Sequence, residues 1–120
     1  MTVKECYDMI GGNYEEAIER LRNERLVTRF ALKFIDDGSY KLLEDSLASG
    51  NYEEAFRAAH TLKGVAANLA FTDLAADASV LTEALRPGHE DQRTEENLKA
   101  LFEKVELTYA GTISGIKQLQ

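Results

Sequence analysis

The chain has 120 residues and a mass of 13.4 kDa, with 44% hydrophobic and 29% charged residues. This length suits one compact domain, 1–120, and the composition is that of a folded globular protein, which excludes a disordered chain. Fourteen basic against twenty-one acidic residues give a net charge of −7, which argues against nucleic acids and anionic membranes as partners.

The sequence shows no sign of a membrane or secreted protein. No run of strictly apolar residues exceeds three, whereas a membrane-spanning helix needs about 20. The first residues lack the basic and apolar regions of a secretory signal. Cys6 is the only cysteine, which excludes an internal disulfide and a cysteine-based zinc site. We therefore expect a cytoplasmic protein, and the start at Met1 favours a free-standing one.

The apolar spacing predicts an all-α fold. With one proline, no tryptophan and no run alternating at period two, no strand is indicated. Apolar residues recur at helical spacing over 26–35, 74–85 and 98–116, and a further helix is expected over 51–69. The first helix is predicted to bury a wide face made of Leu26, Val27, Phe30, Ala31, Phe34 and Ile35.

These helices predict an up-down four-helix bundle, with additional short N-terminal and connecting helices. A short helix over 39–49 is expected to connect two of the long ones. Pro87 and Gly88 should end the helix over 74–85. Gly111 and Gly115 should loosen the last turns of the C-terminal helix.

One hexapeptide, Gly-Asn-Tyr-Glu-Glu-Ala, occurs twice, at 12–17 and at 50–55. In each copy the asparagine is a candidate N-cap, followed by acidic residues at the positive end of the helix dipole. We interpret the repeat as shared capping chemistry rather than as a duplicated module. Ser39, Thr72 and Thr94 are further candidate caps.

Common catalytic motifs are absent from the sequence. It contains no glycine-rich phosphate loop, no paired histidines at metal-binding spacing and no nucleophile elbow, so no metal site is predicted. Paired carboxylates such as Asp36-Asp37 and Glu95-Glu96 are interpreted as solvated charge that complements helix dipoles. His89 follows a proline and a glycine and is interpreted as an ordinary loop histidine.

His60 differs because of the side of its helix on which it lies. At 100° per residue, the apolar side chains of that helix point away from it: Ala58, Leu62, Val65, Ala66 and Leu69. We expect His60 to face solvent, with Lys63 and Gly64 one turn on. This surface of small, partly apolar residues favours a docking partner. The predicted partner-binding residues are Phe56, Arg57, Ala67 and Phe71.

These residue types suit the transfer of a phosphoryl group. Neutral imidazole has a free lone pair that can attack phosphorus. Lys63 could offset the charge of the resulting phosphoryl group. Gly64 would leave space for that group and for a partner's active site, although glycine costs a helix interior roughly 0.5–1 kcal/mol. The residue types alone leave open a plainer reading, in which His60 is incidental and Gly64 marks a tight helix crossing.

The segment Ala-His-Thr-Leu-Lys-Gly-Val-Ala-Ala-Asn-Leu-Ala at 59–70 resembles the motif of the histidine phosphotransfer (HPt) domain family. The stretches 17–35 and 74–88 resemble the helical regions before and after that motif. The resemblance implies a four-helix bundle whose exposed histidine exchanges a phosphoryl group with aspartates of receiver domains in two-component phosphorelays. It assigns to His60 the role of phosphoacceptor, to Lys63 the stabilisation of the phosphate, and to Gly64 the clearance that lets a partner approach His60.

The resemblance also implies a monomeric phosphoryl carrier without ATP-dependent kinase activity. No cofactor is expected on this chain, and Mg²⁺ is expected on the partner receiver domain. The sequence departs from the family at Ala67 and Ala70, where many members have glycine. Ala67 adds a methyl group to the predicted docking face, which puts partner choice in question. Ala70 is expected to let the helix continue past its usual break.

Two other readings remain. A non-phosphorylated helical adaptor would bind a receiver or another protein through the same helix face. The dimerisation helix of a histidine kinase would also display a histidine on a bundle, but such helices need a partner chain to close their core.

Overall fold

A computed structural model describes all 120 residues, which form helices joined by short connections and no strand. The all-α prediction is confirmed. In chain order the elements are α1 (Val3–Ile10), α2 (Tyr14–Leu21), α3 (Glu24–Phe34), α4 (Ser39–Ala48), α5 (Tyr52–Asn68), α6 (Thr72–Leu85), the short 3-10 helix η1 (Glu90–Gln92) and α7 (Glu95–Lys117).

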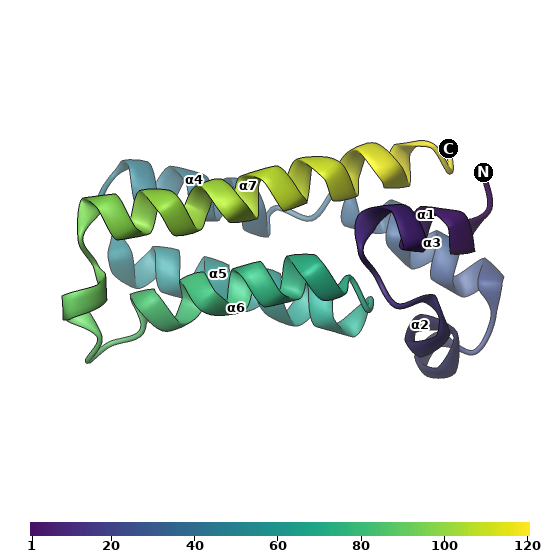
Figure 1. Ribbon diagram of the computed structural model, residues 1–120, viewed down its shortest axis with the longest axis horizontal. Coiled ribbons are helices and arrows are strands. Elements are labelled where there is room, and N and C mark those ends of the chain that lie inside the picture. The colour runs from purple at the N-terminus through teal and green to yellow at the C-terminus, as the bar shows by residue number, and fades with distance from the viewer.

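Helices α4 to α7 run side by side as a four-helix bundle, and α1 to α3 gather at one end of it (Figure 1). The molecule is elongated, 43 Å long and about 20 Å across. Short connections make consecutive bundle helices antiparallel. No helix is both long and apolar enough to cross a membrane.

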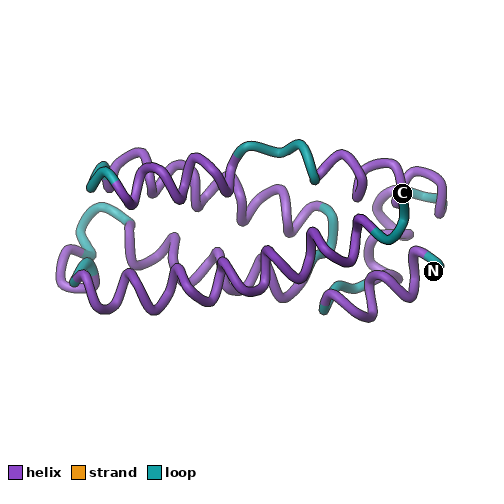
Figure 2. Tube along the Cα trace, turned by 90° about the horizontal axis from the view of Figure 1, so that it is seen from above, coloured by secondary structure: helices purple, strands orange, loops and turns teal.

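The segment predicted as a connector, 39–49, is instead one of the bundle helices. Helices α3 and α4 lie end to end along one side of the molecule, interrupted by the loop visible in Figure 2. Leu43 of α4 is fully buried, and Tyr40 stacks on Tyr109 of α7 with ring centroids 4.0 Å apart. The fourth side of the bundle is therefore built by α4, with α3 continuing its line.

Helix caps explain where several helices begin. The Oδ1 atoms of Asn13 and Asn51 accept hydrogen bonds from the backbone N–H groups three residues on, at 3.0 and 3.1 Å. This confirms the capping interpretation of the repeated hexapeptide. Thr94 caps α7 in the same way. The expectation for Ser39 and Thr72 was wrong, because each is the first residue inside its helix and neither helix has a side-chain cap.

Two packing expectations need correction. The buried face of α3 is narrower than predicted, since only Val27, Ala31 and Phe34 are buried and Phe30 is 38% exposed. Helix α7 runs without interruption through both of its glycines. Gly115 is buried against α1, where an added Cβ would lie 2.5 Å from Ile10 Cγ2. This glycine therefore permits a close helix contact instead of loosening the helix.

Aromatic rings connect the N-terminal helices to the bundle. Seven of them form a continuous series in which neighbouring ring centroids lie 4.0 to 6.0 Å apart. In spatial order they are Tyr14, Tyr7, Phe71, Phe34, Tyr109, Tyr40 and Phe102. Such contacts stabilise a core beyond their buried area, so this series ties both parts of the chain together.

Candidate functional site

Helix α5 displays His60 on its outer face. The opposite side of the helix is buried against the bundle and consists of Ala55, Ala58, Ala59, Leu62 and Ala66. His60 is exposed, which confirms the predicted direction of its side chain. No hydrogen bond holds its ring, so the ring nitrogens are open to an approaching group.

Aromatic and cationic groups flank the imidazole. The Phe56 ring lies one turn earlier on α5, nearly parallel to the His60 ring, with centroids 6.2 Å apart. Phe56 is half-buried, and the Arg86 guanidinium lies 5.2 Å from its ring centroid. Arg86 comes from the end of α6, so two helices shape the surroundings of His60.

Lys63 lies toward α6 and is half-buried. It forms no ion pair. Glu83 of α6 pairs with Arg86, whose Nε lies 2.6 Å from Glu83 Oε2. This hydrogen bond lowers the pKa of Glu83, and smaller electrostatic contributions come from Arg86, His89 and Lys63. The Lys63 ammonium thus contributes to the electrostatic surroundings of Glu83, but it forms no salt bridge with a carboxylate.

Gly64 faces open space. No atom outside its own helix backbone lies within 4 Å of the position that a Cβ would take. Ala67, one turn further on, is exposed. The alternative interpretation of Gly64 as a tight helix crossing is therefore wrong, and the α5 surface beside His60 is low and unobstructed.

Arg57 is exposed but held along its own helix. Its guanidinium nitrogens lie 3.0 Å from Glu53 Oε1 and 2.8 Å from Glu54 Oε2. Both partners belong to the first turn of α5. Its part in partner binding stays a prediction, and a partner would have to compete with these two carboxylates.

Phe71 does not belong to the exposed face, so its prediction as a partner-binding residue was wrong. Helix α5 ends at Asn68, and Phe71 is 1% exposed between Tyr7 and Phe34. The helical projection placed it beside His60 only because it assumed that the helix continues. The same correction applies to Ala70, which has a positive φ of 58° and leaves the helical path.

Two residues beside the site escaped the sequence analysis: Glu83 of α6 and Arg86, the residue after this helix, which form an ion pair. Arg86 follows the last helical residue, and its contact with Phe56 has no signal in the sequence.

The second histidine is engaged elsewhere. His89 Nδ1 lies 2.7 Å from the carbonyl oxygen of Glu83, to which it donates a hydrogen bond near the end of α6. One ring nitrogen of His89 is therefore occupied, in contrast to His60.

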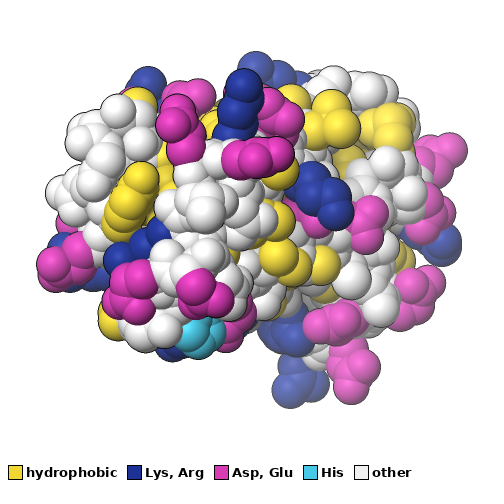
Figure 3. All heavy atoms as spheres, turned by 60° about the vertical axis from the view of Figure 1, so that its left-hand side comes forward, with side chains coloured by type: hydrophobic (Ala, Val, Ile, Leu, Met, Phe, Trp, Pro, Cys, Tyr) yellow, Lys and Arg dark blue, Asp and Glu magenta, His cyan; other side chains and the backbone are white.

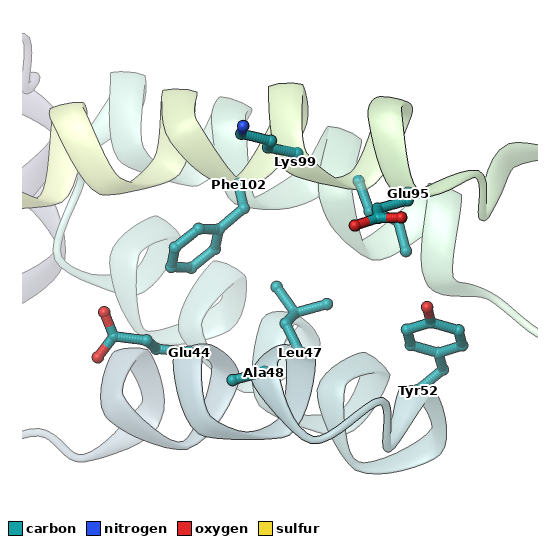
Figure 4. A pocket seen from close by; sticks show the side chains of 8 residues that line it. Glu44, Leu47, Ala48, Tyr52, Glu95, Lys99 and Phe102 are labelled. Carbon is teal, nitrogen blue, oxygen red and sulfur yellow. The ribbon is translucent and has the colours of Figure 1, made fainter.

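A hollow of about 340 Å³ between α4 and α7 is a separate feature (Figure 4). Its lining is mainly apolar, and Phe102 and Leu47 point into it from opposite helices, with Glu44, Glu95 and Lys99 around its margin. It contains none of the predicted site residues and no histidine or cysteine. We therefore place the candidate chemistry on the outer face of α5.

The fold and the site define a helical bundle in which one exposed histidine, His60 on a bundle helix, makes no hydrogen bond. The family model of the Hpt domain matches residues 35–108, more than half of the chain. This chain therefore belongs to the Hpt domain family, and histidine phosphotransfer with receiver domains in phosphorelays is its general role. Searches of curated proteins and of solved structures found no match. The family match includes α4 to α6 and most of α7, and it leaves out α1 to α3.

Proposed function

We propose that His60 is the phosphoacceptor of a phosphorelay intermediate, which takes a phosphoryl group from a receiver aspartate and passes it to another receiver. One observation carries the proposal: His60 is exposed and free of hydrogen bonds, beside a glycine that faces open space. A receiver active site has to bring phosphorus within attacking distance of the imidazole, about 3–3.5 Å. The low surface of α5 gives it room to do so.

The proposed reaction is a nucleophilic displacement at phosphorus. The lone pair of a His60 ring nitrogen forms the N–P bond while the P–O bond to the receiver aspartate breaks. The electron pair of the broken bond stays on the departing carboxylate. The ring then releases the proton of its other nitrogen to water. The reverse sequence delivers the phosphoryl group to a second receiver.

Lys63 and Gly64 support this reaction in different ways. The Lys63 ammonium carries no ion pair and can turn toward the phosphoryl oxygens, where a charge-assisted hydrogen bond would offset their negative charge. Gly64 supplies clearance. Phe56, Arg57 and Ala67 would form the margin that contacts the receiver, and Ala67 would influence which receivers fit.

The partner would supply the metal ion that the transfer needs. We propose that the receiver domain supplies the Mg²⁺ that stabilises the transferring group, and that this chain acts as a monomeric, cytoplasmic carrier without kinase activity of its own. Residues 1–120 would act as one domain in this role.

The test follows the label from phosphorylated receivers. The parent protein, His60→Gln and His89→Gln are each incubated with a panel of receivers that carry labelled aspartyl phosphate. We expect acid-labile label on the parent and on His89→Gln, and none on His60→Gln, with similar melting temperatures for all three. Label on His60→Gln would disprove the site assignment. Receiver binding without any labelling of the parent would favour the adaptor alternative.

A further inference from the structure

Four exposed cations lie on or beside α3. Arg25, Arg29 and Lys33 follow one another on the helix at intervals of four residues, and at 100° per residue they lie within an arc of about 80°. Arg22, the residue that ends α2, is exposed two residues before α3 begins. We refer to these four residues as the α3 basic stripe.

None of the four makes an ion pair with a carboxylate. Elsewhere, five of the basic residues pair with a carboxylate three or four residues away: Lys4, Arg20, Lys41, Arg57 and Arg86. Basic and acidic groups are interspersed on the face that Figure 3 shows. Five further basic residues are also unpaired, but only on α3 do three unpaired cations follow one another along one helix face.

Carboxylates near α3 in sequence do not neutralise the stripe. By the same helical projection Glu24 lies about 140° from Arg29, and its charge acts on the other side, where it contributes to raising the pKa of Tyr14. Asp36 follows the helix and forms no ion pair. The four cations thus remain available to a partner.

Two further observations fit a contact surface. Phe30 lies beside the stripe, 38% exposed, and the Lys33 ammonium is 5.9 Å from its ring centroid. Arg22 has a positive φ of 82°, a conformation that costs free energy in residues other than glycine. The chain therefore places a cation where glycine would be less strained.

The net charge of the molecule favours one class of anionic partner over the others. The net charge of −7 includes the four positive charges of the stripe, so the rest of the chain carries −11. A membrane or a nucleic acid presents negative charge over a wide area and would also meet this acidic remainder. A compact acidic patch on a protein would meet the stripe alone, and the planar guanidinium groups of arginine pair well with carboxylates.

We propose that the α3 basic stripe is a second docking surface, which binds a partner protein through carboxylates spaced along one face of a helix. The surface precedes the family match at 35–108 and is separate from the His60 face. It allows this chain to engage a partner through α3 while α5 remains free for phosphotransfer.

A designed helical peptide tests the proposal directly. The probe carries three glutamates at intervals of four residues along one face, to match Arg25, Arg29 and Lys33, and a second peptide has the same composition with the glutamates distributed around the helix. Each is titrated into isotopically labelled protein at low salt while backbone amide shifts are recorded by NMR. We expect shifts concentrated at 22–33, stronger binding of the first peptide, and loss of binding near 1 M salt, where screening reaches about 3 Å.

Charge reversal supplies the matched comparison. Arg25→Glu/Arg29→Glu should weaken peptide binding about tenfold or more, because two favourable pairs become repulsive. Lys99→Glu/Lys104→Glu changes the net charge equally at exposed, unpaired lysines of α7 and should leave binding within about twofold of its low-salt value. Arg29→Gln is a milder variant if the double reversal disturbs folding.

Several outcomes would overturn the proposal. Equal effects of the two double variants would show that only net charge matters, and an absence of shifts in α3 at millimolar peptide would show that the stripe does not bind carboxylates. Stronger binding to vesicles with 30% phosphatidylserine or to a 20-base-pair DNA would assign the stripe to a membrane or to nucleic acid. These measurements do not involve His60, so they are independent of the phosphotransfer assignment.

Discussion

The functional interpretation of the α5 surface depends on why residue 64 is a glycine. It lies in the interior of α5, where glycine lowers helix stability by roughly 0.5–1 kcal/mol relative to alanine. The surrounding space is open, so packing does not require its missing side chain. Access to His60 is then the physical reason that remains for a glycine at this position.

Substitutions of Gly64 should therefore change stability and transfer in opposite directions. We expect Gly64→Ala to raise the free energy of unfolding by up to about 1 kcal/mol. Gly64→Gln should slow transfer from a receiver strongly, since a displacement of about 1 Å from the attacking geometry can cost about 100-fold in rate. Urea unfolding and receiver-to-His60 transfer are measured on both variants.

Gly111 provides the control for these substitutions. It also lies inside a helix, α7, with no neighbouring atom within 4 Å of an added Cβ. Gly111→Ala and Gly111→Gln should stabilise the protein similarly and leave transfer unchanged. Equal transfer rates for the Gly64 and Gly111 variants would remove the clearance role of Gly64.

At the scale of elements, the contact between α1 and α7 depends on Gly115. An added Cβ would lie 2.5 Å from Ile10 Cγ2 and 3.0 Å from Met9 Cε, both on α1. The buried thiol of Cys6 lies 3.9 Å away, and burial raises the pKa of that thiol. The two helices are therefore close enough that one methyl group would displace α1.

Gly115→Ala should consequently destabilise the protein by about 1–2 kcal/mol, because an overpacking cost of about 1–3 kcal/mol exceeds the gain in helix propensity. Cys6 should also react faster with a thiol reagent as α1 is pushed outward. Chemical unfolding and thiol labelling measure the two effects. A stabilised variant with unchanged labelling would contradict the close contact, and Gly111→Ala again serves as the control.

At the scale of the whole molecule, Phe71 joins the N-terminal helices to the bundle. It lies between the rings of Tyr7 and Phe34, at 5.5 and 5.3 Å. The Tyr7 hydroxyl donates a 2.7 Å hydrogen bond to the Leu69 carbonyl oxygen beside the end of α5. Arg20 of α2 donates to the carbonyl oxygens of Ala67 and Asn68. Helices α1 to α3 thus hold the C-terminal end of the helix that carries His60.

Truncation of Phe71 should therefore affect the whole fold. We expect Phe71→Ala to reduce the free energy of unfolding by about 3–5 kcal/mol, with loss of both helical groups in one transition. Phe71→Leu should fold and transfer phosphoryl groups at the parental rate, since Phe71 does not face the partner. Calorimetry and transfer assays provide the measurements. Two separate transitions in the parent, or slow transfer by a stable Phe71→Leu, would contradict this account.

The sequence by itself determined the local features of this protein. Helical periodicity and capping chemistry depend on residues within a few positions, so the all-α fold, the Asn13 and Asn51 caps and the outward direction of His60 could be predicted. The resemblance of 59–70 to the HPt motif is likewise local, and it indicated the family from the sequence alone.

The tertiary structure decided what depends on contacts between distant segments. Because α5 ends at Asn68, Phe71 does not lie on the predicted surface. Periodicity identified α3 but could not show that no other helix covers Phe30. Arg86 reaches Phe56, and Gly115 admits α1, only because separate helices meet there. Periodicity gives the direction of a side chain around its own helix, whereas the helices packed against that helix determine whether the side chain is buried.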